Sequence, residues 1–154
     1  MRITKYGVEI NTDGNNILVK ESSCNYTMEN ALDNCDKIAK VMKEVFKLDK
    51  KAEEYVYMIA LNTKLKPIGF FEVSHGAVNQ SIMSPREIFI RALLVGASNI
   101  ILVHNHPSGD TTPSQSDIRT TKRMKDCANL MNISLLDHII IGDDIYSFLR
   151  EGSL

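Results

Sequence analysis

Two histidines and an aspartate in the segment ILVHNHPSGDTTPSQSD, residues 101–117, have a spacing suited to metal coordination. His104 and His106 end an apolar run, and residues two apart in an extended chain point to the same side of a strand. Asp117 follows in the first turn of an expected helix. Two imidazoles and one carboxylate, with a fourth position left for water, form a ligand set typical of catalytic zinc. Zinc lowers the pKa of its water to about 7, so this set predicts hydrolytic chemistry at neutral pH.

The same segment has other interpretations. A polar loop with hydrogen-bonded histidines is the structural alternative, and two histidines in phase followed by an inward carboxylate argue against it. The metallo-β-lactamase pattern HxHxDH requires an acid and a histidine where this chain has Ser108 and Gly109. The letters HNH resemble the name of a nuclease whose three residues are scattered along a ββα unit, so that match is accidental.

The expected helix after the histidines directs Asp117 toward the sheet, because one helical face contains Asp117, Thr121, Met124, Ala128 and Met131. Ser114 precedes this helix and is a candidate cap. Its hydroxyl could accept from a helix amide and still donate to a reacting oxyanion. Pro107 and Gly109 favour a sharp turn between the histidines and the helix.

Hydrophobic periodicity predicts the elements that position these residues. A hairpin is expected over 3–22 around DGNN and a helix over 28–47, followed by the connector KLDKKAE. The expected elements after residue 52 are strands 53–62 and 67–75, helix 84–97, strand 99–104, helix 114–132 and a closing pair of strands within 134–151. Ser84, Pro85 and Glu87 favour a capping box at the start of the second helix. The pattern predicts an α/β protein of the α+β type, with a mixed, largely antiparallel sheet flanked by helices.

Composition limits the class of protein. The 154 residues contain 44% hydrophobic and 24% charged residues, which is ordinary for one folded domain. The formal net charge of −1 argues against strong binding to a nucleic-acid backbone. The three cysteines, which are Cys24, Cys35 and Cys127, form no CxxC pair and favour a reducing cytoplasm. No segment approaches the ~20 apolar residues of a membrane span, so we expect a cytoplasmic protein with no membrane contact.

The order H-x-H, seven residues, then S-x-x-D is the JAMM signature, which His104, His106, Ser114 and Asp117 complete. The longer stretch SHGAVNQSIMSPREIFIRALLVGASNIILVHNHPSGDTTPSQSD, with LLDHIIIG after it, resembles the RadC branch of the MPN (JAB) metallopeptidase superfamily. The resemblance covers about residues 53–151. It implies a mixed sheet flanked by helices, layered as in cytidine deaminases. It also implies Zn²⁺ held by the two histidines and the aspartate.

The resemblance further implies a glutamate that activates the water. The family pattern E-x-x-x-x-x-x-L-[ND] selects Glu54, with Glu72 as its rival and Glu53 on the opposite face of the strand. Ser114 is implied as the oxyanion donor. His75 and His138 are candidates by residue type, but a turn residue and a strand residue bonded to nearby backbone are the favoured interpretations.

Two regions are expected. Residues 1–50 would form an accessory segment of a hairpin and a helix, and residues 51–154 the RadC-like domain. No helix-hairpin-helix region of the kind many RadC proteins have in front is evident, which argues against an inherited DNA-binding role. Asn105 stands where JAMM peptidases commonly have Ser or Thr, as in RadC-like members, and this argues against ubiquitin-type substrates.

Three functions are compatible with these residues. The leading hypothesis is a zinc-dependent peptidase or isopeptidase acting on a peptide or protein. The second is a DNA-repair or DNA-processing accessory protein, as the RadC name implies. The third is a metal-free scaffold for protein association, and a homodimer is compatible with any of the three. The complete ligand set argues against the scaffold, and the balanced charge argues against DNA.

We expect weak binding to generic duplex DNA at physiological salt, because a small basic stripe, Arg119, Lys122 and Arg123, accompanies a balanced charge. Fluorescence anisotropy with a labelled duplex measures this. Sub-micromolar, salt-sensitive binding that Arg119→Glu and Arg123→Glu weaken would instead support the DNA-repair hypothesis.

Overall fold

The computed structural model describes residues 1–27, 32–76 and 83–154. Within these residues the strands are β1 (Arg2–Ile10), β2 (Asn16–Asn25), β3 (Glu54–Leu61), β4 (Pro67–Gly76), β5 (Asn99–Asn105), β6 (Ser134–Ile141) and β7 (Ile145–Ser147). The helices are α1 (Cys35–Glu44), a short 3₁₀ helix η1 (Leu48–Lys50), α2 (Pro85–Val95) and α3 (Gln115–Leu130). The described strands form one seven-stranded sheet in the order β2-β1-β4-β3-β5-β6-β7.

The sheet is mixed and largely antiparallel, as predicted. Parallel pairing joins β5 to β6 and, through one bridge, β1 to β4. The pairs β1–β2, β3–β4, β3–β5 and β6–β7 are antiparallel. The central strands β3 and β5 are almost continuously buried, because helices cover both faces of the sheet.

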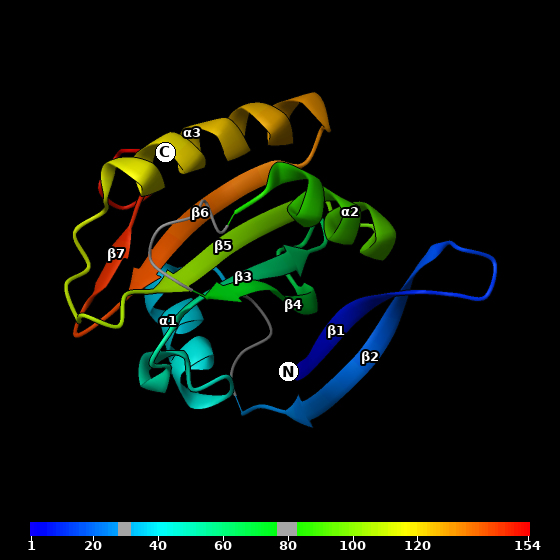
Figure 1. Cartoon of the computed structure of the whole chain (residues 1–154). Helices are drawn as coiled ribbons and strands as arrows, with labels where there is room; N and C mark the ends of the chain where they lie inside the picture. Colours follow the sequence, from blue (N-terminus) through cyan, green and yellow to red (C-terminus); the bar gives the residue numbers. More distant parts are fainter. Residues whose placement is uncertain (28–31, 77–82) are drawn as a thin grey trace.

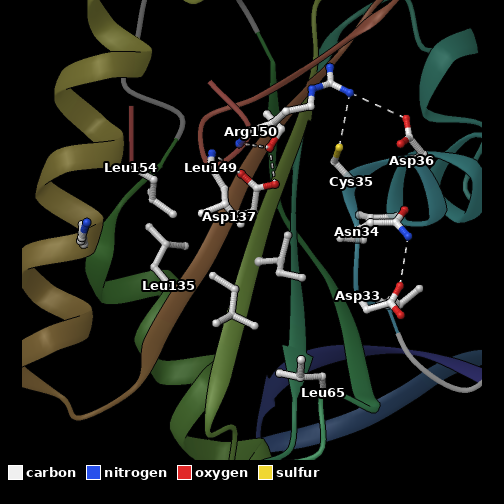
Figure 2. Close-up of a pocket in the computed structure, with 16 residues that line it drawn as sticks. Asp33, Asn34, Cys35, Asp36, Leu65, Leu135, Asp137, Leu149, Arg150 and Leu154 are labelled. Carbon is white, nitrogen blue, oxygen red and sulfur yellow. Dashed lines mark hydrogen bonds and ion pairs between the residues drawn. The ribbon is translucent and has the colours of Figure 1, made fainter. Parts of the chain in front are cut away.

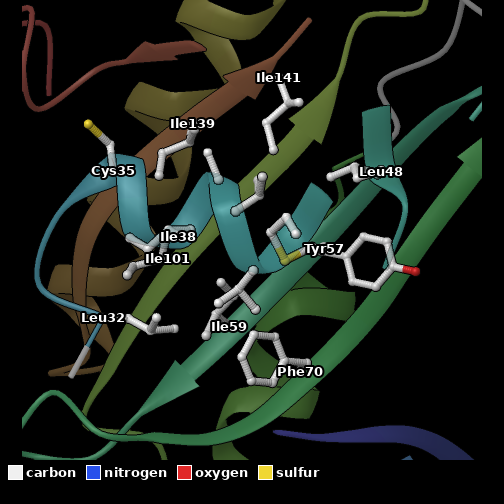
Figure 3. Packing of buried hydrophobic residues seen from close by; sticks show 14 of the residues in the cluster. Leu32, Cys35, Ile38, Leu48, Tyr57, Ile59, Phe70, Ile101, Ile139 and Ile141 are labelled. Atoms are coloured by element: carbon white, nitrogen blue, oxygen red, sulfur yellow. The ribbon is translucent and has the colours of Figure 1, made fainter. Parts of the chain in front are cut away.

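Each face of the sheet has its own apolar core. On one face Ile38 and other residues of α1 pack on Ile59, Ile101 and Ile139 of the sheet, as Figure 3 shows. On the other face α2 and α3 cover alternate residues of the same strands, including Met58. This three-layer arrangement, visible in Figure 1, confirms the expected mixed sheet flanked by helices.

The N-terminal hairpin is confirmed and extends to residue 25. Its first strand joins the sheet at the pair Lys5 and Phe70, and Ile3 shares the core of α1. The division into residues 1–50 and 51–154 stays a prediction.

No helix in the described part of the chain is long and apolar enough to cross a membrane.

The expected start of the first helix was wrong, and so was the expected cap of the second. The first helix starts at Cys35 and not at residue 28, because the side chain of Asn34 accepts from the amide of Lys37 and caps it. Residues 28–31 of that expected helix lie outside the described residues. Helix α2 starts at Pro85 as predicted, but the Ser84 side chain makes no capping bond, so the expected capping box is wrong.

Glu87 explains the missing capping box in α2. Its carboxylate accepts from Arg86 at 2.9 Å and from Arg91 at 3.2 Å, so it is engaged by these two side chains. The helix ends at Val95, two residues before the expected end, because the next residue, Gly96, has a positive φ of 70°, a conformation that glycine adopts without strain.

The last strand is shorter than the predicted closing pair, since β7 ends at Ser147 and the chain then turns. A cavity of about 690 Å³ lies beside this turn, between α1, α3 and β6 (Figure 2). Several of its polar groups already have partners inside the protein. Asp137 accepts from the Ser147 hydroxyl at 2.6 Å, and Arg150 donates to the Ile145 carbonyl at 2.8 Å. The cavity is therefore mainly an apolar hollow.

Candidate metal centre

Four side chains from three parts of the sequence converge at one end of the sheet. Glu54 starts β3, His104 and His106 end and follow β5, and Asp117 lies in the first turn of α3. Oε1 of Glu54 lies 3.9 Å and 3.7 Å from the Nε2 atoms of His104 and His106. The carboxylate oxygens of Asp117 lie 3.5 Å and 3.6 Å from the same nitrogens. One ligand atom from each residue lies within 4.8 Å of all the others.

Strand register brings Glu54 to the histidines. Val56 of β3 pairs with His104 of β5, and Glu54 lies two residues before Val56. Side chains two apart share a face of a strand, so Glu54 and His104 point to the side of the sheet that α3 covers. The side chain of His104 is 1% exposed and that of Glu54 is 17% exposed, so the cluster is buried at His104 and reaches solvent at Glu54.

Helix capping orients Asp117. The Ser114 hydroxyl accepts from the Asp117 amide at 3.1 Å, and Asp117 Oδ2 accepts from the Ser114 amide at 2.7 Å. This reciprocal capping box confirms Ser114 as the cap of α3. The Ser114 hydroxyl also donates to Asp117 Oδ2 at 2.6 Å. One carboxylate oxygen is thus held by the helix start, while the other faces His104.

The donor set fits a divalent metal such as zinc. Nδ1 of His106 lies 2.7 Å from the carbonyl oxygen of Asp110, which can only accept, so Nδ1 bears the hydrogen of the neutral ring. Its Nε2 is then a bare lone pair, 3.1 Å from Nε2 of His104 and close to two carboxylates. Imidazole nitrogens and carboxylate oxygens converging in this way are ligands that zinc takes.

Electrostatics keep two of these ligands in the form a metal requires. Burial lowers the pKa of His104 well below its usual value, and the neighbouring His138 lowers it further. Burial raises the pKa of Asp117, but a protonated His106 and the hydrogen bonds from Ser114 lower it by more, so its net pKa falls below the usual value. At neutral pH His104 is therefore neutral and Asp117 ionised.

The sequence offered three glutamates as possible bases. Among the residues that the structure describes, Glu54 belongs to the metal cluster, whereas Glu53 and Glu72 do not. Glu72 is engaged elsewhere, because its carboxylate accepts from Lys5 and from the Tyr57 hydroxyl, each at 3.0 Å. The structure thus brings together Glu54, both histidines and the aspartate.

Asn105, between the two histidines, fixes the backbone around Glu54. Its Oδ1 accepts from the amide of Tyr55 at 2.8 Å, and its Nδ2 donates to the carbonyl of Glu53 at 3.0 Å. Both bonds are largely buried, since Asn105 is 2% exposed. The asparagine that distinguishes this sequence from the common JAMM wording therefore ties the end of β5 to the start of β3.

The loop after His106 is tied to the turn between β6 and β7. The amide of His106 donates to the carbonyl of Ile141, and the amide of Asp143 donates to the carbonyl of Gly109, each at 2.9 Å. Gly109 has a φ of 86°, and a Cβ there would lie 2.6 Å from the Asp143 carboxylate. Gly142 packs directly on the Gly109 backbone. Glycine at 109 is therefore required by its backbone conformation, and glycine at 142 by the lack of space beside the Gly109 backbone.

The other two histidines differ from each other. His75 belongs to β4 and not to a turn, and its Nδ1 lies 3.0 Å from Glu72, outside the cluster. His138 is fully buried, and its Nε2 lies 2.8 Å from Nδ1 of His104. The interpretation that His138 bonds nearby backbone is therefore wrong, because its ring nitrogens contact side chains. Its Nδ1 contacts the hydroxyl of Thr121. The sequence had placed Thr121 on the face of α3 that points toward the sheet, because it lies four residues after Asp117.

The inward face of α3 is shorter than predicted. Met131 is 48% exposed because the helix ends at Leu130. The basic stripe is exposed, as expected for a solvated face, and consists of Arg119, Lys122 and Arg123.

The fold and the site together define an α+β protein with a candidate divalent-metal centre at a strand end. A model of the family described as "RadC-like JAB domain" matches residues 32–153. The chain therefore belongs to the RadC-like JAB family.

Similar proteins include several called UPF0758 protein. The one from Clostridium acetobutylicum is 50% identical over 102 residues, which is 66% of this chain and 44% of the relative. The one from Alkaliphilus metalliredigens is 46% identical over 119 residues, 77% of this chain and 50% of the relative. The chain thus spans about half the length of the curated relatives it matches. Their name states no activity.

His104→Ala should lower the free energy of unfolding of the metal-free protein by about 1–3 kcal/mol, because it leaves the buried Nε2 of His138 without a partner. His106→Ala should cost less, since water can reach the Asp110 carbonyl that it leaves. Urea unfolding in the presence of a chelator measures both values. An equal loss in the two variants would contradict the importance of the buried contact.

Zinc affinity should rise with pH through the pKa of His106. The hydrogen bond with Asp117 raises the pKa of His106 and burial opposes it, so the net pKa lies above its usual value. A metal must displace that proton, so binding weakens as the pH falls through this pKa. Competition with a chromophoric chelator from about pH 6 to about pH 8, corrected for the chelator's own protonation, checks the direction. An affinity that is constant over this range would be inconsistent with proton displacement at His106.

Proposed function

We propose that this protein is a zinc-dependent hydrolase of the JAMM type that cleaves peptide or isopeptide bonds. The observation that supports it is the convergence of Glu54, His104, His106 and Asp117, with ligand atoms within 4.8 Å of one another. In this proposal the two histidines and Asp117 hold Zn²⁺. Zinc in such a site lowers the pKa of a coordinated water and polarises a carbonyl group.

Glu54 is the proposed general base. Burial raises its pKa, His106 opposes this and the nearby Asp117 adds to it, and the net pKa lies above the usual value. A raised pKa makes the carboxylate a better proton acceptor near neutral pH. Glu54 would take a proton from the water that attacks the carbonyl carbon. It would then return the proton to the amine that leaves when the C–N bond breaks.

Ser114 is the proposed oxyanion donor. Its hydroxyl is exposed beside the cluster, where it donates to Asp117 and accepts from the helix amide. Donation to a substrate oxygen requires only rotation of the O–H bond away from Asp117, because the capping bond uses a lone pair.

A peptide or protein is the proposed substrate, and the cytoplasm the proposed compartment. A role in DNA repair has weaker support, because the exposed basic stripe is small and the net charge is −1.

Glu54→Gln should retain zinc and lose hydrolysis by at least ~10²–10⁴-fold, because the amide keeps size and hydrogen bonding but cannot accept the proton. Glu53→Gln and Glu72→Gln are matched controls outside the cluster and should retain most activity. Zinc content and cleavage of a library of fluorogenic peptides, measured side by side for the three variants, provide the comparison.

Loss of turnover in Glu72→Gln with normal turnover in Glu54→Gln would assign the base elsewhere. Normal cleavage by all three variants would rule out the proposed mechanism.

A further inference from the structure

A chain of buried polar side chains runs from the metal cluster into the protein. Nδ1 of His104 lies 2.8 Å from Nε2 of His138. Nδ1 of His138 lies 2.6 Å from Oγ1 of Thr121, and that hydroxyl donates to the carbonyl of Asp117 at 2.7 Å. The three side-chain residues are at most 2% exposed, so water does not compete for these bonds.

The end of this chain fixes the direction of every hydrogen bond in it. A carbonyl oxygen can only accept, so the single hydroxyl hydrogen of Thr121 is directed to Asp117. The Thr121 oxygen must then accept from His138, which places the hydrogen of His138 on Nδ1. The opposite direction would bring two acceptor oxygens to 2.7 Å with no hydrogen between them.

The same logic continues to the metal cluster. A neutral imidazole has one N–H, so Nε2 of His138 accepts, and Nδ1 of His104 must donate to it. Nε2 of His104 is left as a bare lone pair, and this atom faces His106, Glu54 and Asp117. His104 is thus in the tautomer that can bind a metal.

Packing holds His138 in place. Its ring stacks on Phe148 with the centroids 5.0 Å apart and the planes 6° from parallel. His138 lies on β6, directly opposite Leu102 of the neighbouring strand β5. Rotation of the ring would break the stack and both hydrogen bonds at once.

We propose that His138 is a positioning residue that holds His104 in the tautomer and orientation needed for metal binding, and that Thr121 sets the direction of the hydrogen-bond chain. The inference rests on the proposed zinc site but not on hydrolytic activity. The partner of a ligating histidine is more often a carboxylate, a carbonyl or water, and here it is a second, neutral histidine. The ligand is therefore oriented without adding charge to the site.

Two pairs of variants test the chain. Thr121→Val keeps the shape of the side chain and removes the hydroxyl, whereas Thr121→Ser keeps the hydroxyl. His138→Phe keeps a ring on Phe148 without donor or acceptor, whereas His138→Gln keeps one of each. Thr121→Val and His138→Phe should weaken zinc binding about 10- to 100-fold, and the Ser and Gln variants should stay within about threefold of wild type. Chelator competition gives the affinities, and urea unfolding of the metal-free proteins gives the stabilities.

Equal zinc affinity in Thr121→Val and Thr121→Ser, with both folded, would overturn the proposal. A direct measurement requires no variant to fold. Two-bond ¹H–¹⁵N NMR correlations of metal-free wild-type protein should show the hydrogen of His104 on Nδ1, and a hydrogen on Nε2 would overturn the inference. If the wild type fails to bind zinc, the proposed function fails, but the NMR result still decides the tautomer.

Discussion

The antiparallel pairing of β3 with β5 places the first residue of one strand beside the last residues of the other. In an antiparallel pair, the start of one strand lies beside the end of the other, so residues far apart in the sequence meet at one end of the sheet. The position of a residue along its strand determines the face of the sheet to which its side chain points. A shift of one residue in this register would send Glu54 to the opposite face from His104. The buried apolar residues of both strands prevent such a shift, because it would expose the two cores. The packing of the sheet therefore determines which acid meets the histidines.

The site joins helix α3 to two strands of the sheet. Asp117 belongs to a helix on one face, and its capping bonds with Ser114 set both the helix start and the direction of the carboxylate. The buried contact from His104 to His138 links adjacent strands through side chains as well as backbone. A buried polar group costs free energy unless it is paired, so these bonds stabilise one arrangement against its alternatives.

Much of the fold and of the site could be predicted from the sequence, because periodicity identifies strands and helices, and alternation places His104 and His106 on one side. The role of Glu54 was predicted from the family pattern and not from residue spacing, because its contact with the histidines depends on which strands pair. The contact between His138 and His104 could not be predicted, because it depends on which strand lies next to β5. The start of α1 was missed because apolar residues at helical spacing continue before Asn34, whereas the side chain of Asn34 caps the helix and starts it at Cys35.

The two glycines that meet between the histidine loop and the turn after β6 limit how this surface can vary. Gly109 and Gly142 bring two backbones into direct contact, with no side chain between them. The amide of Asp143 in the turn also donates a hydrogen bond to the carbonyl of Gly109 in the loop, so the two segments are held together beside the metal cluster. Any lengthening of one segment would have to be matched by the other.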